Sequence, residues 1–224
     1  MLGTHLRTSR EYTAPSHAEF DIETFDAAAG CPYDAVVHAA AFTDVLAAYT
    51  VPEQAAQCYR TNVLGTRRLA QWARSTAFVF ISTEYVFDGE RGNYREEDPL
   101  SPINFYAMTK AAGEREVMRA VAHHLIIRTL FKPRPFEWPD ACVDMWTSGD
   151  YVDRIAVEID RAVEAFLRGT VSGVLHVGTG RKSIFDLARE SRQVRPIRRG
   201  DLKVTLPRDT SLDLGRWREI RDRL

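Results

Sequence analysis

Tyr106 and Lys110 are the first residues in this sequence whose types and spacing could do chemistry. Residues four apart lie on one face of a helix, so the phenol and the ammonium would point the same way. A free tyrosine has a pKa near ~10, and a neighbouring lysine cation favours the phenolate. Such a tyrosine can donate a proton to a carbonyl that receives hydride, or take one from an alcohol that loses hydride. The spacing alone is common in helices, so this interpretation needs further residues.

A hydroxyl group upstream supplies a third member of this set. The apolar run over residues 77–81 ends in Ser82 and Thr83. Open α/β sheets bind ligands beyond the carboxyl ends of their strands, so a hydroxyl there would lie next to the bound molecule. It could hydrogen-bond a carbonyl oxygen as charge develops on that oxygen. The chemistry by itself does not choose between Ser82 and Thr83.

The histidines could indicate a different chemistry, that of a metal site. His38 ends an apolar run, where we expect a structural role. His123 and His124 are adjacent, so their side chains diverge, and no carboxylate–histidine pattern accompanies them. We therefore expect no catalytic metal.

The elements that position these residues alternate between strands and helices. Continuous apolar runs predict strands buried on both faces, as in a parallel sheet covered by helices, at residues 34–41, 77–82, 124–129 and 174–177. Apolar residues at three- and four-residue spacings predict helices over 52–73, 106–122 and 152–167. Residues 11–13 are a weak further strand candidate. This order predicts an α/β fold with a doubly wound, Rossmann-type, mostly parallel sheet and helices on both faces.

The alternation of strands and helices is interrupted between residues 132 and 149, where prolines occur among aromatic residues. This composition predicts a loop-rich connection over the sheet. We expect residues 1–130 to form a core with the Thr/Tyr/Lys set. Residues 131–224 would form a reduced lobe intertwined with that core, giving one structural domain overall.

Composition limits the class of protein. The formal net charge of the 224 residues is −1, which gives no electrostatic case for binding nucleic acid or an anionic membrane. No apolar run approaches the ~20 residues that span a bilayer. Three cysteines, Cys31, Cys58 and Cys142, form neither a disulfide framework nor a metal-binding pair. We expect a cytoplasmic protein with no nucleic acid and no membrane partner.

Five ordered segments together resemble the extended short-chain dehydrogenase/reductases, and most closely the dTDP-4-dehydrorhamnose reductase branch. The segments cover residues 38–43, 61–66, 82–89, 97–102 and 106–110. The resemblance implies a Rossmann-type fold and an NAD(P)H-dependent reduction of a 4-keto sugar nucleotide.

The resemblance also implies roles for individual residues. Thr83, Tyr106 and Lys110 match the catalytic set of the family. Tyr106 and Lys110 would also bind the cofactor, and Lys110 would bond its nicotinamide ribose. The other positions that match cofactor-binding residues are Gly3 in a glycine-rich turn, Asp21 and Ile22 at the adenine, Ala39, Ala40 and Ala41 at the phosphates and ribose, and Asn62 on a helix that supports the site.

The sequence departs from the family at its start. The family opens with a strand that ends in Gly-x-x-Gly-x-x-Gly, whose amides cradle the pyrophosphate. Residues 1–3 look like the end of this motif, with Gly3 as its last glycine. We expect the first strand and most of the turn to be missing, which would leave unpaired strand edges and no phosphate cradle.

Two further departures affect specificity. After Thr129 the family usually has a longer substrate-binding excursion, so the sugar is not carried over to this chain. Ser16 and His17 stand where an acid would recognise the ribose hydroxyl of NAD. A neutral or basic residue tolerates a 2′-phosphate better, so NADP is favoured over NAD.

Three alternatives to a reductase remain open. The chain could be a non-catalytic binding or regulatory relative, as one subunit of methionine adenosyltransferase is, and act with a partner enzyme. It could be a truncated reading frame whose start lies upstream. It could be an epimerase or dehydratase, for which Glu84 stands where an acid can sit beside Thr83. A homodimer is equally compatible with the sequence.

Overall fold

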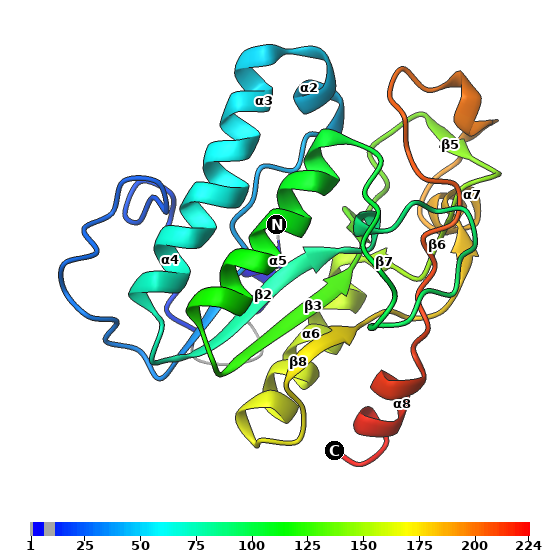
Figure 1. The fold of residues 1–224 in the computed structure, drawn as a ribbon. Helices are drawn as coiled ribbons and strands as arrows, with labels where there is room; N and C mark the ends of the chain where they lie inside the picture. The colour runs from blue at the N-terminus through cyan, green and yellow to red at the C-terminus, as the bar shows by residue number, and fades with distance from the viewer. Residues whose placement is uncertain (1, 7–11) are drawn as a thin grey trace.

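The computed structural model describes residues 2–6 and 12–224, and a four-stranded parallel sheet lies at its centre (Figure 1). The strands lie side by side in the order β1 (Ala35–His38), β2 (Ala77–Thr83), β3 (His124–Thr129) and β8 (Gly173–His176). Each falls within a residue or a few of a strand that the apolar runs predict. The Rossmann-type prediction is therefore confirmed.

Helices cover both faces of this sheet because the strands are apolar on both faces. Successive side chains of a strand point to opposite sides. Phe78 and Phe80 of β2 pack toward α4 (Thr66–Trp72) and α5 (Phe105–Ala120). Val79 and Ile81 pack on the other side, against α1 (Leu2–Leu6), α6 (Val152–Leu167) and α8 (Gly215–Arg221). The predicted helix over 152–167 is confirmed to the residue.

The crossover from β1 to β2 begins with α2 (Val45–Thr50), followed by α3 (Pro52–Tyr59). It then runs through η1 (Arg60–Gly65), a π-helical segment, into α4. The periodicity predicts one uninterrupted helix over 52–73, and the structure adds this wider turn in its middle. Asn62, Val63 and Gly65 of η1 are buried. The π segment therefore turns a polar residue and a glycine toward the interior.

Helix α5 is held close to η1 by a glycine. A Cβ added at Gly113 would lie 2.8 Å from the carbonyl oxygen of Asn62 and 3.0 Å from the Phe80 ring. The helix begins at Asn104, whose side chain accepts a hydrogen bond from the Ala107 amide at 2.9 Å. This cap places Tyr106 in the first turn of the helix, one turn before Lys110.

A smaller lobe lies beyond the carboxyl ends of the sheet strands (Figure 1). Its elements are β4 (Phe131–Lys132) paired with β7 (Asp150–Tyr151), β5 (Asp140–Cys142) paired with β10 (Arg195–Ile197), β6 (Trp146–Thr147) paired with β9 (Lys182–Ser183), α7 (Ile184–Arg189) and η3 (Arg199–Asp201). Residues 132–149 therefore form short strands within the loop-rich connection that the sequence predicts. These strands of two or three residues are too short to show a period-2 pattern.

The N-terminal expectations are only partly covered by the structure. Glu11 and Met1 lie outside the described residues, and Tyr12 and Thr13 form no strand. The weak strand candidate is therefore not seen at those two positions. Within residues 2–6 and 12–224, every helix is too short or too polar to cross a bilayer.

Candidate active site

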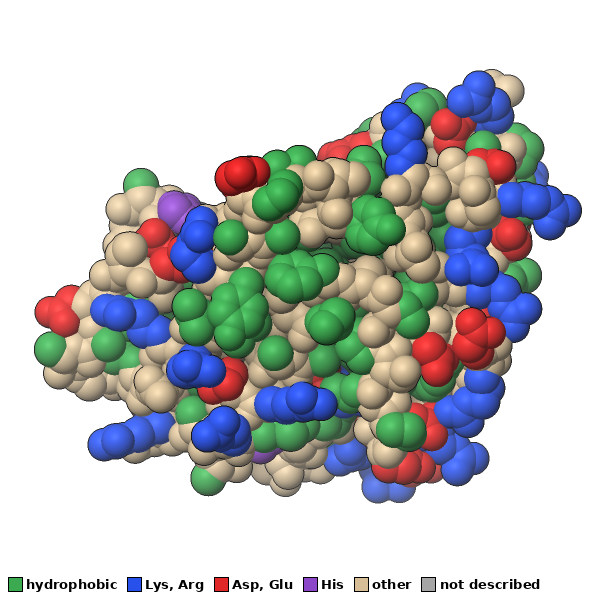
Figure 2. All heavy atoms as spheres, turned by 45° about the horizontal axis from the view of Figure 1, so that its top comes forward, with side chains coloured by type: hydrophobic (Ala, Val, Ile, Leu, Met, Phe, Trp, Pro, Cys, Tyr) green, Lys and Arg blue, Asp and Glu red, His purple; other side chains and the backbone are tan. Residues whose placement is uncertain are grey.

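Thr83 and Tyr106 meet at the carboxyl edge of the sheet. Thr83 is the last residue of β2 and pairs in register with Thr129, the last residue of β3. The Thr83 hydroxyl lies near enough to the Tyr106 phenol to interact with it electrostatically. The Thr83 hydroxyl also accepts from the Tyr85 amide at 3.2 Å, within η2 (Glu84–Val86). Figure 2 shows the surface with the top of Figure 1 tilted forward, and hydrophobic side chains gather over the middle of this face.

The structure separates the two hydroxyls that the sequence leaves equivalent. Ser82 lies on the face of β2 that carries Phe80, and its hydroxyl donates to Oε1 of Glu114 at 2.5 Å. Glu114 belongs to α5 and is fully buried. The Ser82 hydroxyl is therefore bonded to a buried carboxylate, whereas the Thr83 hydroxyl lies beside the phenol.

The Tyr106 phenol is protonated at neutral pH. Burial raises its pKa above the ordinary range, the nearby Cys58 thiol adds to the increase, and the Thr83 hydroxyl opposes it. This result differs from the expectation that a lysine lowers the phenol pKa. A protonated phenol beside a hydroxyl suits the donation of a proton to a carbonyl oxygen.

Lys110 is directed toward the sheet. Its Nζ donates to the Ile81 carbonyl oxygen at 2.8 Å and lies 4.1 Å from the centroid of the Phe80 ring. Neither contact involves the phenol. Burial lowers the pKa of the ammonium to about 7, although the charge of Glu114 opposes this change. Lys110 is thus one turn from Tyr106 on α5, as the spacing predicts, and carries a proton that is weakly held.

The predicted adenine and phosphate positions line one hollow. Asp21, Ile22 and Ala39–Ala41 surround a volume of about 330 Å³ beside β1. His17 and Thr61 also line it. The three alanines follow directly after β1, where their small side chains leave space at the end of the strand. The structure therefore gathers these predicted residues at the same edge of the sheet as Thr83.

Asn62 and Gly3 lie apart from this hollow. The Asn62 side chain accepts from the Phe42 amide at 2.9 Å and donates to the Phe42 carbonyl at 3.1 Å and to Thr109 at 3.0 Å. With 1% of its surface exposed, it holds the segment after Ala41 against α5. Gly3 lies in α1, and a Cβ there would meet no atom within 4 Å. Cofactor contacts by either residue stay predictions.

A buried ion pair beneath the site was not anticipated from the sequence. Arg128 of β3 donates through Nε and Nη2 to the Glu114 carboxylate, at 3.0 and 2.8 Å, and both side chains are buried. Arg128 is the register partner of Ser82. An arginine inside an otherwise apolar strand was the available signal, because such a residue requires a buried partner.

Glu84 connects the end of β2 to the small lobe. It is fully buried, and its carboxylate accepts from the Thr210 hydroxyl at 2.6 Å and from the Ser148 amide at 3.3 Å. Burial raises the pKa of Glu84 to about 7, and these hydrogen bonds oppose the increase. Its oxygens therefore face the lobe.

The histidines make local contacts. His38 Nε2 lies 2.9 Å from the Thr66 hydroxyl, and His124 Nδ1 lies 2.7 Å from the Val121 carbonyl. The His123 ring lies against the Phe166 ring, with 4.4 Å between the ring centroids and a tilt of 37° between the planes. Across the part of the chain that the structure describes, His, Cys, Asp and Glu nowhere gather in a group of three that could hold a metal ion.

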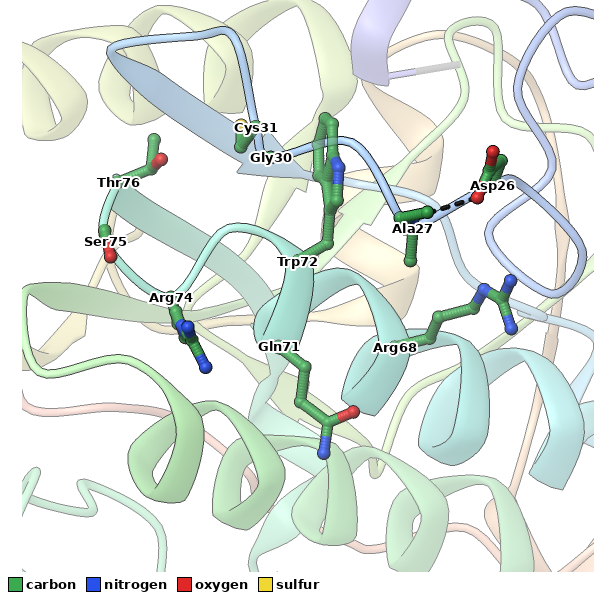
Figure 3. Close-up of a pocket in the computed structure, with 11 residues that line it drawn as sticks. Asp26, Ala27, Gly30, Cys31, Arg68, Gln71, Trp72, Arg74, Ser75 and Thr76 are labelled. Carbon is green, nitrogen blue, oxygen red and sulfur yellow. Dashed lines mark hydrogen bonds between the residues drawn. The ribbon is translucent and has the colours of Figure 1, made fainter.

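A larger hollow of about 750 Å³ lies at the opposite edge of the sheet (Figure 3). Three segments border it: residues 26–28 with Gly30 and Cys31 before β1, residues 74–76 before β2, and Arg68, Gln71 and Trp72 of α4. Arg68 already donates to the Phe25 carbonyl at 3.0 Å. None of the predicted site residues borders this hollow. The larger of the two hollows is therefore not the one beside the candidate active site.

Residues 2–131 match a family model described as the RmlD substrate binding domain. The dTDP-4-dehydrorhamnose reductase of Mycolicibacterium smegmatis is 32% identical over 174 residues, which cover 70% of this chain and 52% of that protein. Methionine adenosyltransferase 2 subunit beta of Danio rerio is 39% identical over 67 residues, covering 30% of this chain and 21% of that protein. The chain thus spans about half the length of the mycobacterial reductase.

The fold also matches solved structures. A dTDP-4-dehydrorhamnose reductase from Bacillus anthracis, in complex with NADP, superposes with a TM-score of 0.79. The match covers 99% of this chain and 94% of that chain at 22% identity. At this identity the likeness establishes the fold.

Proposed function

The chain belongs to the RmlD substrate binding domain family, and on this premise we propose that it reduces the 4-keto group of a sugar nucleotide with NADPH or NADH. The observation that carries the proposal is the contact between Thr83 and the protonated Tyr106 phenol at the carboxyl edge of the sheet. The relatives named as dTDP-4-dehydrorhamnose reductases support this substrate class.

Three residues have separate roles in the proposed reduction. Thr83 holds the keto oxygen, and Tyr106 donates its phenolic proton to that oxygen as negative charge develops there. Lys110 lies one turn along the helix and has a pKa of about 7, so it is the source of the proton that restores the Tyr106 phenol. A bound nicotinamide cofactor supplies the hydride that reduces the keto carbon.

Residues 1–130 would hold the cofactor, and residues 131–224 would hold the sugar nucleotide. The hollow beside β1 fits an adenosine moiety, because the alanines at 39–41 leave open space that Asp21 and Ile22 border. His17 borders the same hollow, and its neutral or cationic ring tolerates a 2′-phosphate. We therefore favour NADPH over NADH.

The test begins with binding. The purified chain is titrated with NADPH and with NADH while nicotinamide fluorescence is followed, and saturation with micromolar NADPH is the expected result. NADPH oxidation is then measured with a dTDP-4-keto-6-deoxy sugar. Tyr106→Phe should reduce the rate by at least ~100-fold, the scale of general acid catalysis, with unchanged NADPH binding and melting temperature. An undiminished rate would remove Tyr106 as the acid.

A second candidate, a non-catalytic regulatory subunit, is favoured by the match to the methionine adenosyltransferase subunit. Under this alternative the chain would co-purify with a partner enzyme in fixed proportion and would show no NADPH oxidation. An epimerase or dehydratase receives less support, because the Glu84 oxygens are bonded to Thr210 and Ser148 and do not face Thr83.

A further inference from the structure

Lys132 stands at the same edge of the sheet as Tyr106, on the side away from the hollow beside β1. It lies in β4, which follows β3 after a single residue, Leu130. Leu130 packs in one hydrophobic cluster with Tyr85 and Tyr106. The hollow lies beside β1, Thr83 ends β2, and Lys132 follows β3. Because the strand order is β1-β2-β3, Thr83 lies between the hollow and Lys132 along this edge of the sheet.

The charge of Lys132 has no close counter-ion within the described residues. Two other cations of the lobe are paired, Lys182 with Asp150 at 2.7 Å and Arg181 with Asp209 at 2.8 Å. Burial lowers the pKa of the Lys132 ammonium, and the nearby charge of Glu84 opposes this change. The Glu84 oxygens are bonded to Thr210 and Ser148. Lys132 is thus a half-buried cation that lacks an ion pair.

An exposed indole covers this cation. The Lys132 Nζ lies 4.9 Å from the ring centroid of Trp138, whose surface is 45% exposed. Phe136 beneath it is buried and packs edge-on against the indole at 5.0 Å. The cation–π contact and the buried support fix the position of the ammonium without neutralising its charge.

We propose that Lys132, covered by Trp138, binds the diphosphate group of the sugar nucleotide. The inference rests on the proposed function and names the site for the charged part of that substrate. A keto group held at Thr83 and Tyr106 requires the diphosphate to lie further along the same edge. Lysine is a common phosphate-binding residue, and a dianion supplies the counter-ion that Lys132 lacks.

The test uses the quenching of tryptophan fluorescence by dTDP. The chain has four tryptophans, and Trp138→Phe identifies the part of the signal that belongs to this site. Lys132→Met should weaken dTDP binding by at least ~10-fold, the loss of one charge-assisted contact. Lys203→Met, which removes an exposed lysine of the same lobe, is the matched control and should bind dTDP as the natural chain does. Calorimetry with dTDP repeats each comparison.

Further ligands distinguish the sources of the signal. Inorganic pyrophosphate should compete with dTDP in the natural chain but not in Lys132→Met, and thymidine should bind weakly to both. The proposal is overturned if Lys132→Met binds dTDP normally, if the natural chain does not bind dTDP, or if the substitution weakens NADPH binding instead. A chain that binds dTDP through Lys132 but never oxidises NADPH would leave this site standing and remove the proposed reductase activity.

Discussion

At the scale of single residues, the neighbouring hydroxyls of Ser82 and Thr83 have separate partners. Ser82 donates to the buried Glu114 carboxylate, and Thr83 contacts the Tyr106 phenol. Ser82→Ala should therefore lower the free energy of unfolding by ~1–3 kcal/mol, because a buried carboxylate loses a donor. Thr83→Val removes the acceptor of the Tyr85 amide, so it should lower stability by ~1 kcal/mol, and it should reduce NADPH oxidation. Urea denaturation and steady-state kinetics on both variants check this division, and the reverse pattern would contradict it.

Glu84 predicts a specific dependence of stability on pH. Its pKa rises from 4.5 to about 7 on folding, so the folded chain binds more protons than the unfolded chain between these values. Its contribution to stability therefore falls as pH rises through this window and is constant above it. Burial shifts the pKa values of His38 and His176 in the opposite direction, so the natural chain alone does not isolate the effect.

Glu84→Gln isolates that effect, since glutamine does not titrate. The melting temperature of the variant minus that of the natural chain should increase from pH ~4 to pH ~7 and then level off. Differential scanning calorimetry at several pH values measures this difference. A difference that stays flat, or decreases with pH, would show that folding does not raise the pKa of Glu84.

At the scale of elements, α5 and β3 are joined through the ion pair of Glu114 and Arg128. Arg128→Met would leave a buried carboxylate without its cation, and we expect the free energy of unfolding to fall by ~3–5 kcal/mol. Glu114→Gln combined with Arg128→Met should recover much of that loss, because no charge then remains buried. Denaturant titrations of the single and double variants provide the comparison. A double variant as unstable as Arg128→Met would mean that packing, rather than charge, joins the two elements.

At the scale of the whole molecule, ligand binding should stabilise the folded chain. A ligand that binds only the folded state raises the melting temperature according to its concentration and affinity. NADPH should therefore raise the melting temperature more than NADH does at equal concentration. His17→Asp should reverse this order, because a carboxylate bordering the hollow repels the 2′-phosphate. Ser75→Asp adds the same charge beside the other hollow and should not alter the order.

The parts of the fold predicted from the sequence are those with a repeated pattern. The apolar runs of β1, β2, β3 and β8 and the periodicity of α6 extend over enough residues to be recognised. The family resemblance implied that the alanines after β1 bind the cofactor, and the structure places them at the same edge of the sheet as Thr83.

The parts that the sequence did not predict depend on contacts between distant residues. The pairing of β5 with β10 joins segments separated by more than 50 residues, and neither strand is long enough to show a pattern. The orientation of Lys110 toward the Ile81 carbonyl and the burial of Cys58 behind Tyr106 likewise follow from packing. Helical spacing predicts which residues share a face but not what that face meets.

The π segment η1 also constrains how this chain can change in evolution. One residue of an α-helix corresponds to a rotation of ~100°, so a wider turn alters the phase between α3 and α4. Deleting one residue from Arg60–Gly65 would restore a regular helix and rotate Leu69 and Ala70 away from the sheet. Gaps of a single codon should therefore be rare in this part of related genes, whereas exposed loops such as residues 26–30 should tolerate them.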